Sequence, residues 1–293
     1  MFEDQMARRG FVKKAAGMAG LAAGFPLAAC GATASSDAPA ATATGDLKLG
    51  VASYSLRKFS REQAIEMVKA LRTEYIHIKS MHLPYELSAA EAQAAAGQFQ
   101  AAGLQIVGGG VITFEEDSDD GVRKYFEYAR NASMPLMAVT GPVGIWPRVE
   151  RFATEYDIRV AIHNHGPEDE RYPTPYEALE QVDGMDPRMG VCIDVGHTAR
   201  TGIDLVKSIA DAGSRLLDMH MKDLRSFDGH TDVIVGQGAM PVPEIFAQLL
   251  AMKFGGQVNL EYELDADDPL PGMQQSFAYM RGLLSGLTGG ART

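Results

Sequence analysis

The chain has 293 residues, of which 46% are hydrophobic and 22% are charged, the composition of an ordinary globular protein. The formal net charge of −11 argues against a protein whose main task is to hold a phosphate backbone. After the N-terminal segment, no apolar run is long enough to span a lipid bilayer.

Residues 1–29 have the layout of an export signal and are left out of the expected fold. Arg8 and Arg9 are followed by Phe11 and two lysines, and a modest apolar stretch comes next, at 15–29. A twin arginine in this setting resembles the Tat signal, which carries folded proteins across the bacterial inner membrane. The plain alternative is the start of a basic amphipathic helix. The layout predicts a periplasmic protein.

The end of this signal carries a cysteine. Leu-Ala-Ala-Cys-Gly at 27–31 resembles a lipoprotein cleavage box, in which Cys30 is lipidated and becomes the new N-terminus. Cleavage at a nearby Ala-x-Ala site, without a lipid, is the alternative. Residues 30–46 are mostly Ala, Thr, Ser, Gly and Pro and are expected to form a disordered tether. We therefore expect contact with a membrane only through the signal or the lipid anchor.

From residue 47 on, short apolar runs alternate with segments of helical pattern. Eight strand-plus-helix units are expected, the number that closes a (β/α)8 TIM barrel over 47–285, with a tail at 286–293. Cys192 lies mid-strand and is interpreted as a small buried hydrophobe. The expected strands are 47–53, 75–79, 104–108 and 136–140, then runs ending at His163, Asp194, His220 and Glu261, and the helices are 60–71, 88–102, 119–131 and 147–156, with later ones beginning near Thr174-Pro175 and at Pro269 or Pro271.

Four of these runs end in side chains that bind metals or transfer protons: His163, Asp194, His220 and Glu261. Each run reads as a buried parallel strand. Because the carboxyl ends of parallel barrel strands meet at one face, we expect these side chains to converge. Two imidazoles and two carboxylates would form a divalent-metal site, with a carboxylate available for proton transfer.

The segments 162–167 (Ile-His-Asn-His-Gly-Pro), 192–197 (Cys-Ile-Asp-Val-Gly-His), 220–223 (His-Met-Lys-Asp) and 260–263 (Leu-Glu-Tyr-Glu) together resemble the xylose isomerase-like barrel superfamily. Its members are often labelled sugar phosphate isomerases/epimerases. They include hydroxypyruvate isomerase, D-tagatose/D-psicose 3-epimerase, inosose dehydratase and, more distantly, endonuclease IV. The resemblance covers 47–285 and is specific for the superfamily, not for one reaction.

The resemblance implies one divalent metal held by Glu, Asp, His and Glu from the last four strands. Asp194, His220 and Glu261 match three of these ligands, whereas His163 stands where the relatives have Glu. In the epimerases, two glutamates act as paired acid/base groups on opposite faces of the sugar. With Glu261 alone, symmetric two-base epimerisation is in question.

The sequence favours Mn²⁺ or Co²⁺ as the single metal, because export in folded form allows loading before the chain meets tighter-binding ions. A site of two histidines and carboxylates also accepts Zn²⁺, and Mg²⁺ stays an alternative. The residues do not choose among them.

Catalytic roles are expected for Glu261, His165 and Lys222. Glu261 would bind the metal and exchange a proton; its plain alternative is a surface carboxylate. We favour His163 as the metal ligand and His165 as a substrate or proton-transfer group, and the reverse assignment stays open. Lys222 shares a strand face with His220, so its cation would hold a substrate oxygen or enolate, unless it is a solvated lysine.

Four further residues are candidates for substrate binding. His197, three residues after Asp194, resembles the superfamily's substrate-binding histidine. Lys79 and His82 lie just after the second strand, where barrel loops usually line the pocket. Trp146 follows the fourth strand and is either a sugar-stacking platform or a packing residue.

Two glycine-rich stretches, 108–110 and 236–238, are interpreted as loops, and neither has the spacing of a phosphate-cradling motif. The expected substrate is therefore a neutral sugar or an oxidised keto-sugar.

The predicted chemistry is proton removal from a carbon next to a carbonyl, through an enediolate stabilised by metal chelation. Reprotonation gives isomerisation or epimerisation, the statement that the superfamily supports. Elimination, for instance from a 3-keto-glycoside, fits the exported location and the histidine substitution. A nuclease is disfavoured by the acidic charge, and a non-catalytic sugar-binding lipoprotein is the alternative from another class. The oligomeric state is not predicted.

Overall fold

The computed structural model describes residues 47–229 and 231–289. The predicted signal at 1–29 and tether at 30–46 lie outside the described residues. Within the described part of the chain, no helix is both long and apolar enough to cross a membrane.

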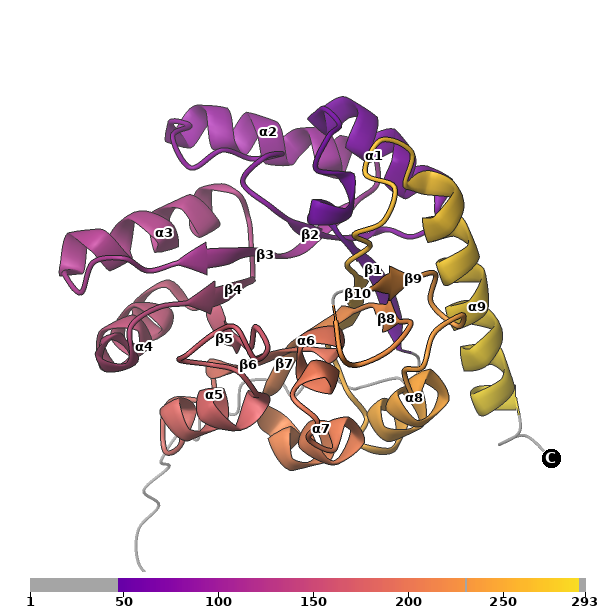
Figure 1. Ribbon diagram of the computed structural model, residues 1–293. Coiled ribbons are helices and arrows are strands. Elements are labelled where there is room, and N and C mark those ends of the chain that lie inside the picture. The colour runs from indigo at the N-terminus through magenta and orange to yellow at the C-terminus, as the bar shows by residue number, and fades with distance from the viewer. Residues whose placement is uncertain (1–46, 230, 290–293) are drawn as a thin grey trace, which may run out of the picture. The chain divides into compact units, whose positions relative to one another are not determined.

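Eight parallel strands close into a barrel in the spatial order β1-β10-β7-β6-β5-β4-β3-β2, with helices around the outside (Figure 1). Hydrogen-bonded neighbours run in parallel all the way round, so the barrel has no open sheet edge. The predicted TIM barrel is confirmed. Its strands are β1 (Lys48–Ala52), β2 (Tyr75–Ile78), β3 (Gln105–Thr113), β4 (Leu136–Thr140), β5 (Arg159–His163), β6 (Met189–Asp194), β7 (Leu216–Met221) and β10 (Gln257–Leu260).

Side-chain caps explain why several helices begin where the sequence predicted. Ser60, Ser88 and Thr174 each form a capping box, in which the hydroxyl accepts from the third helical N–H and that residue's side chain accepts from the cap N–H. The helices are α1 (Arg61–Ala70), α2 (Ala89–Ala101), α3 (Asp119–Asn131), α4 (Trp146–Tyr156), α5 (Pro175–Val182), α6 (Val195–Arg200), α7 (Leu205–Ala212), α8 (Val242–Ala251) and α9 (Leu270–Gly289), with short 3-10 turns η1 (Ser53–Leu56), η2 (Val143–Ile145) and η3 (Gly213–Arg215).

Strand β3 differs from the prediction, because the glycines at 108–110 lie inside the strand and not in a loop. The register against β4 shifts between Gly109 and Ile112, so the strand is irregular at this point. Gly110 has φ +124°, and a Cβ there would lie 2.1 Å from the carbonyl oxygen of Ala138. Only glycine fits this close approach of two strands.

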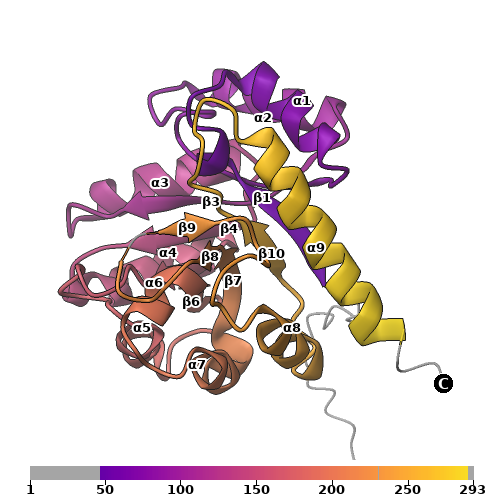
Figure 2. The same cartoon turned by 45° about the vertical axis from the view of Figure 1, so that its right-hand side comes forward.

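Three further features were not predicted. Helix α6 follows β6 without a loop, ahead of α7. The connection from β7 to α8 contains a short antiparallel pair, β8 (Asp223–Leu224) and β9 (Asp232–Val233), which both views draw beside β10 (Figures 1 and 2). Helix α9 continues to Gly289, past the predicted barrel boundary at residue 285.

The core has two parts. Large apolar side chains such as Phe99, Phe126 and Phe246 fill the layer between strands and helices. A separate small cluster, Leu136, Ala138, Ala161, Cys192 and Leu217, lies on β4 to β7. Ala161 is two residues before His163 in β5, so both side chains lie on the same face of the strand. The small cluster therefore lies beneath the strand-end residues inside the barrel. Cys192 is buried, as predicted.

Candidate active site

The four predicted strand-end residues lie together at one end of the barrel. His163, Asp194, His220 and Glu261 come from β5, β6, β7 and the residue after β10, which are consecutive neighbours in the barrel. Ligand-capable atoms of Asp194, His220 and Glu261 lie within 4.8 Å of one another. His163 Nε2 is 3.1 Å from His220 Nδ1. All four side chains are buried.

Lys222 is the cation at the centre of this group. Its Nζ lies 3.1 Å from Asp194 Oδ2, 3.1 Å from Glu261 Oε2 and 2.6 Å from Glu263 Oε1. Gly196 makes room for the lysine stem, since a Cβ there would lie 2.6 Å from Lys222 Cγ and Cδ. Lys222 is only 4% exposed, so the alternative of a solvated lysine is wrong.

The charges of this group support one another. Burial alone would lower the pKa of Lys222, but Asp194 and Glu261 raise it well above its usual value. Burial would raise the pKa of Glu261, whereas Lys222 and then His220 hold it well below its usual value. Asp194 likewise keeps a lowered pKa against burial because of Lys222. At neutral pH the ammonium and both carboxylates are therefore ionised.

The histidines form a wall of closely packed imidazoles. Burial, and then the neighbouring His220, lowers the pKa of His163 well below its usual value. Burial also lowers the pKa of His197 to about 4, despite the opposing effect of Asp194. The rings of His165 and His197 meet edge to face at 4.6 Å. At neutral pH His163 and His197 are thus neutral imidazoles, each with one donor and one acceptor nitrogen.

Asp194 has two roles. Its Oδ1 accepts a hydrogen bond of 2.8 Å from the His197 N–H and so caps α6, while Oδ2 faces Lys222. The Asp194 carboxylate therefore both caps a helix and faces the other charged groups of the site. The cap also fixes His197 beside the pocket, one turn into the helix.

The donor set fits a divalent cation. Asp194, His220 and Glu261 supply two carboxylates and an imidazole, and His220 Nδ1 lies 3.4 Å from Glu261 Oε2. Asp194 Oδ2 is buried and has the Lys222 ammonium against it. Cys192, which also lies near His163 and His220, is a poorer ligand because burial raises the pKa of its thiol. A bound ion would share the Asp194 and Glu261 carboxylates with Lys222, which also pairs with Glu263 at 2.6 Å.

A cavity of about 400 Å³ opens above this group. The first half of the barrel contributes neutral and cationic side chains to it, whereas the second half contributes imidazoles and carboxylates. Tyr54, Thr113 and Thr140 were not predicted; each follows or ends a strand, but none carries a motif. The lining residues are Tyr54, Lys79, Val111, Thr113, Thr140, His163, His165, Asp169, His197, Glu261 and Glu263.

Lys79, predicted from its place after β2, is part of this lining. Its Nζ lies 4.9 Å from the centre of the Tyr54 ring and 3.9 Å from Glu261 Oε1. The exposed fraction of its side chain is 18%. It is therefore a second cation at the pocket, more open to solvent than Lys222.

His82 and Trp146 were predicted as substrate contacts, but the structure does not place them in the lining of this cavity. His82 is buried, and its Nδ1 lies 3.0 Å from Ser53 Oγ, because the loop after β2 folds back on the turn after β1. Trp146 begins α4 and donates from Nε1 to the Tyr172 hydroxyl at 2.8 Å. It is fully packed, so the packing alternative describes it.

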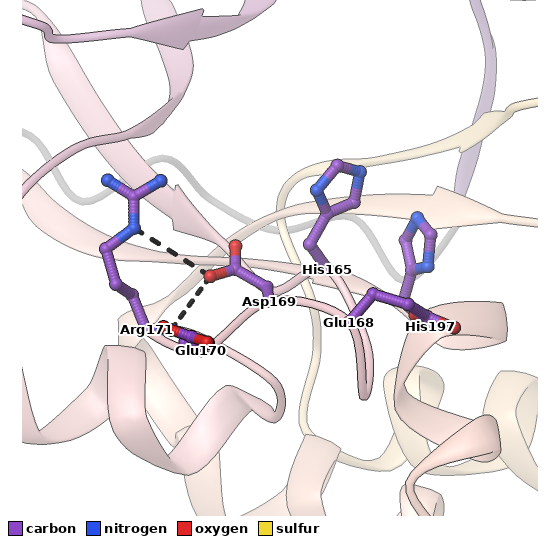
Figure 3. A pocket seen from close by; sticks show the side chains of 6 residues that line it. All are labelled: His165, Glu168, Asp169, Glu170, Arg171 and His197. Atoms are coloured by element: carbon purple, nitrogen blue, oxygen red, sulfur yellow. Dashed lines mark hydrogen bonds and ion pairs between the residues drawn. The ribbon is translucent and has the colours of Figure 1, made fainter.

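A second cavity of about 580 Å³ lies beside the first (Figure 3). The loop after β5 forms much of its wall. His165, Asp169 and His197 line both cavities. The second cavity is lined by His165, Glu168, Asp169, Glu170, Arg171 and His197.

Comparisons with known proteins agree with this geometry. Residues 146–283 match the family model described as xylose isomerase-like TIM barrel, which confirms the resemblance found in the sequence. No curated protein sequence matches the chain.

Solved structures share the fold at low identity. An uncharacterized protein from Parabacteroides distasonis is 23% identical over 80% of this chain and 98% of its own, with a TM-score of 0.65. The D-psicose 3-epimerase from Clostridium cellulolyticum H10 is 16% identical over 81% and 99%, with a TM-score of 0.66. A probable 3-DHS dehydratase from Bacillus anthracis is 14% identical over 79% and 99%, with a TM-score of 0.65.

Proposed function

Residues 146–283 match the xylose isomerase-like TIM barrel family, and from this match we propose that the protein is a divalent-metal-dependent enzyme of the sugar isomerase/epimerase type. Its reaction would begin with removal of a proton from the carbon next to a carbonyl of a sugar or keto-sugar. The observation that carries the proposal is the convergence of Asp194, His220 and Glu261 around Lys222 beneath a polar cavity. Similar folds in an epimerase and a probable dehydratase support it.

Glu261 is the base in this proposal. It is ionised because Lys222 lies 3.1 Å away, and the same contact makes it a weak base in the resting site. When a substrate oxygen gains negative charge, Lys222 pairs with that oxygen, and Glu261 becomes the better proton acceptor. A divalent ion held by Asp194, His220 and Glu261 would polarise the carbonyl as a Lewis acid.

The group that acts after proton removal decides the product. The proton that Glu261 has taken can return to carbon, directly or relayed through His163 or His165, which gives isomerisation or epimerisation. His163 stands at the strand end where the sequence resemblance implies glutamate, and this favours elimination as a second candidate. In a 3-keto-glycoside, Glu261 takes the C2 proton, the C–H electrons form the C1=C2 bond, and the glycosidic C1–O bond breaks. The leaving oxygen takes the proton that Glu261 removed from C2, relayed through an imidazole, and departs as an alcohol.

Proton NMR in D₂O distinguishes these outcomes. The Zn²⁺-loaded protein is incubated with free ketohexoses and with a 3-keto-glucoside, and Glu261→Gln is the control. Deuterium at the carbon next to the carbonyl, with an intact skeleton, supports isomerisation or epimerisation; release of the alcohol with loss of the C2 proton supports elimination. Ligand binding without exchange or release, unchanged in the variant, would instead identify a non-catalytic sugar-binding protein.

We also propose that the protein acts in the periplasm after Tat-type export, anchored by a lipid on Cys30. The sequence of the segment at 1–31 supports this location. Mass spectrometry of the protein purified from membranes would show a chain that begins at a lipidated Cys30. An unmodified chain cleaved at a different residue would contradict the anchor.

A further inference from the structure

The active-site cavity continues into a second compartment. The inner cavity of about 400 Å³ contains Glu261 and His163, and the outer cavity of about 580 Å³ contains Glu168, Glu170 and Arg171. Each has the size of an ordinary ligand pocket, roughly 300–1,000 Å³. Their linings share His165, Asp169 and His197, so these three residues mark the boundary between the two cavities. A ligand that binds over Glu261 and extends along these residues would enter the outer cavity.

Hydrogen bonds within the loop after β5 hold the wall of the outer cavity in place. The N–H of His165 donates to the Tyr172 carbonyl at 2.9 Å, and that of Asp169 donates to the Gly166 carbonyl at 3.0 Å. Asp169 Oδ1 accepts from the Arg171 N–H at 2.8 Å. The loop is thus braced from both ends, and the compartment does not depend on a ligand to form.

The loop is also tied to its surroundings. Arg200 on α6 pairs with Glu168 at 2.5 Å. The Tyr172 hydroxyl donates to the Gly141 carbonyl at 3.2 Å and accepts from Trp146. The buried packing of Trp146 thereby supports the outer wall, although the ring itself contacts no ligand.

The side chains of the outer cavity indicate the chemistry of its occupant. In Figure 3 the Asp169 carboxylate lies between Arg171 and His165. Three carboxylates against one guanidinium disfavour an anionic group such as a phosphate or a uronate. All six lining side chains are charged or polar, which suits a hydroxyl-rich ligand better than an aromatic one. Carboxylates accept hydrogen bonds from hydroxyls, and the guanidinium donates them.

We propose that the outer cavity binds a second, neutral sugar unit, so the natural substrate is a disaccharide-like glycoside. One unit would lie over Glu261 and His163, and the bond between the units would pass His165, Asp169 and His197. The proposal rests on the proposed function, since it assumes that the inner cavity holds a sugar. It goes beyond that function because a free ketohexose would use the inner cavity alone.

Affinities of unreactive sugars for the full-length, metal-loaded protein test the proposal. Isothermal titration compares methyl β-D-glucoside with cellobiose and maltose, and cellobionate serves as an anionic disaccharide. We expect at least one neutral disaccharide to bind tenfold or more tightly than the methyl glucoside, and cellobionate to lose that gain. Glu170→Trp, which fills the outer cavity, should abolish the gain; Glu180→Trp on the exposed face of α5 is the matched control and should keep it.

The outcomes separate the two proposals. Equal binding of methyl glucoside and both disaccharides overturns the outer sugar site and leaves the proposed function in place. The outer sugar site is also overturned if Glu170→Trp, with unchanged thermal unfolding, still binds a disaccharide more tightly than methyl glucoside. Absence of binding for every one of these sugars overturns the outer sugar site, whereas the proposed function falls only if free ketohexoses and the 3-keto-glucoside show neither exchange nor release.

Discussion

The two halves of the barrel contribute different chemistry to one cavity. Strands β5, β6, β7 and β10 end in His163, Asp194, His220 and Glu261, whereas the first four strands lead into neutral side chains and a single lysine. Both halves have the same backbone arrangement and place side chains at the same barrel end. In the proposed function this difference is a division of labour: the second half would transfer protons and hold the metal, and the first half would shape the substrate site.

The family match follows this division. The family model matches residues 146–283, which contain all four acid/base and ligand residues of the proposed site. Fold alone does not determine a reaction, because catalytic groups are placed on a shared scaffold. We therefore expect changes in the second half to alter turnover, and changes in the first half to alter substrate affinity.

The largest effect is expected for Glu261→Gln. Loss of a general base reduces turnover by about 10²–10⁴-fold. Sugar affinity should change little, because glutamine keeps the size of the side chain. Single-turnover kinetics and proton exchange in D₂O measure the loss. Glu263→Gln, two residues further along the same strand face, is the control, and an equal loss there would show that charge balance around Lys222 is the cause.

Lys222→Met tests the role of the buried ammonium between Asp194 and Glu261. The variant leaves Asp194 and Glu261 buried without their cation, which destabilises the fold by about 3–5 kcal/mol. The same change should strengthen Co²⁺ binding by about tenfold or more, since an ammonium no longer shares the carboxylates. Thermal unfolding with and without Co²⁺, together with a Co²⁺ absorption titration, measures both effects.

Lys79→Met is the matched control from the first half. Lys79 is 3.9 Å from Glu261 Oε1, and its side chain is partly exposed. Its loss should change Co²⁺ affinity and stability much less. Unchanged or weaker Co²⁺ binding in Lys222→Met would mean that the lysine does not compete with the metal.

The site residues in the second half of the barrel were easier to predict from the sequence than those in the first half. His163, Asp194, His220 and Glu261 each follow an apolar run, and the geometry of a parallel barrel then brings them together. Lys222 was found because a spacing of two keeps it on the strand face of His220. Its position between two carboxylates depends on three separate strands and on the absence of a side chain at Gly196, which no local pattern indicates.

The residues that the first half of the barrel contributes to the cavity were harder to predict, because the direction of a loop depends on tertiary contacts. His82 and Trp146 lie near strand ends in the sequence, yet Ser53 and Tyr172 hold them away from the cavity. Tyr54 and Thr140 do line the cavity, although neither carries a charge or motif. The family roles of the predicted catalytic residues stay predictions until the variants are measured.

Thr140→Val should change the Michaelis constant and leave turnover nearly unchanged. Thr140 lines the inner cavity, and its hydroxyl is buried without a hydrogen-bond partner among the described residues. We therefore expect a bound substrate hydroxyl to pair with it. Loss of a neutral hydrogen bond of about 0.5–1.5 kcal/mol raises KM by roughly two- to tenfold. Thr154→Val on exposed α4 is the control. A tenfold loss of kcat at constant KM would instead place Thr140 at the reacting carbon and weaken the distinction between the halves.

Asp232→Asn should give the smallest effect, visible only as a change of stability with pH. Burial raises the Asp232 pKa from an ordinary 3.8 to about 6, with Lys222 opposing the shift. The folded state therefore binds this proton more tightly than the unfolded state, so stability falls as pH rises from about 4 to 6. Asparagine removes that loss, and the midpoint of thermal unfolding should rise by less than about 4 °C at pH 8 and stay unchanged at pH 3.5. A gain of equal size at both pH values would show that Asp232 acts through packing and not through its charge.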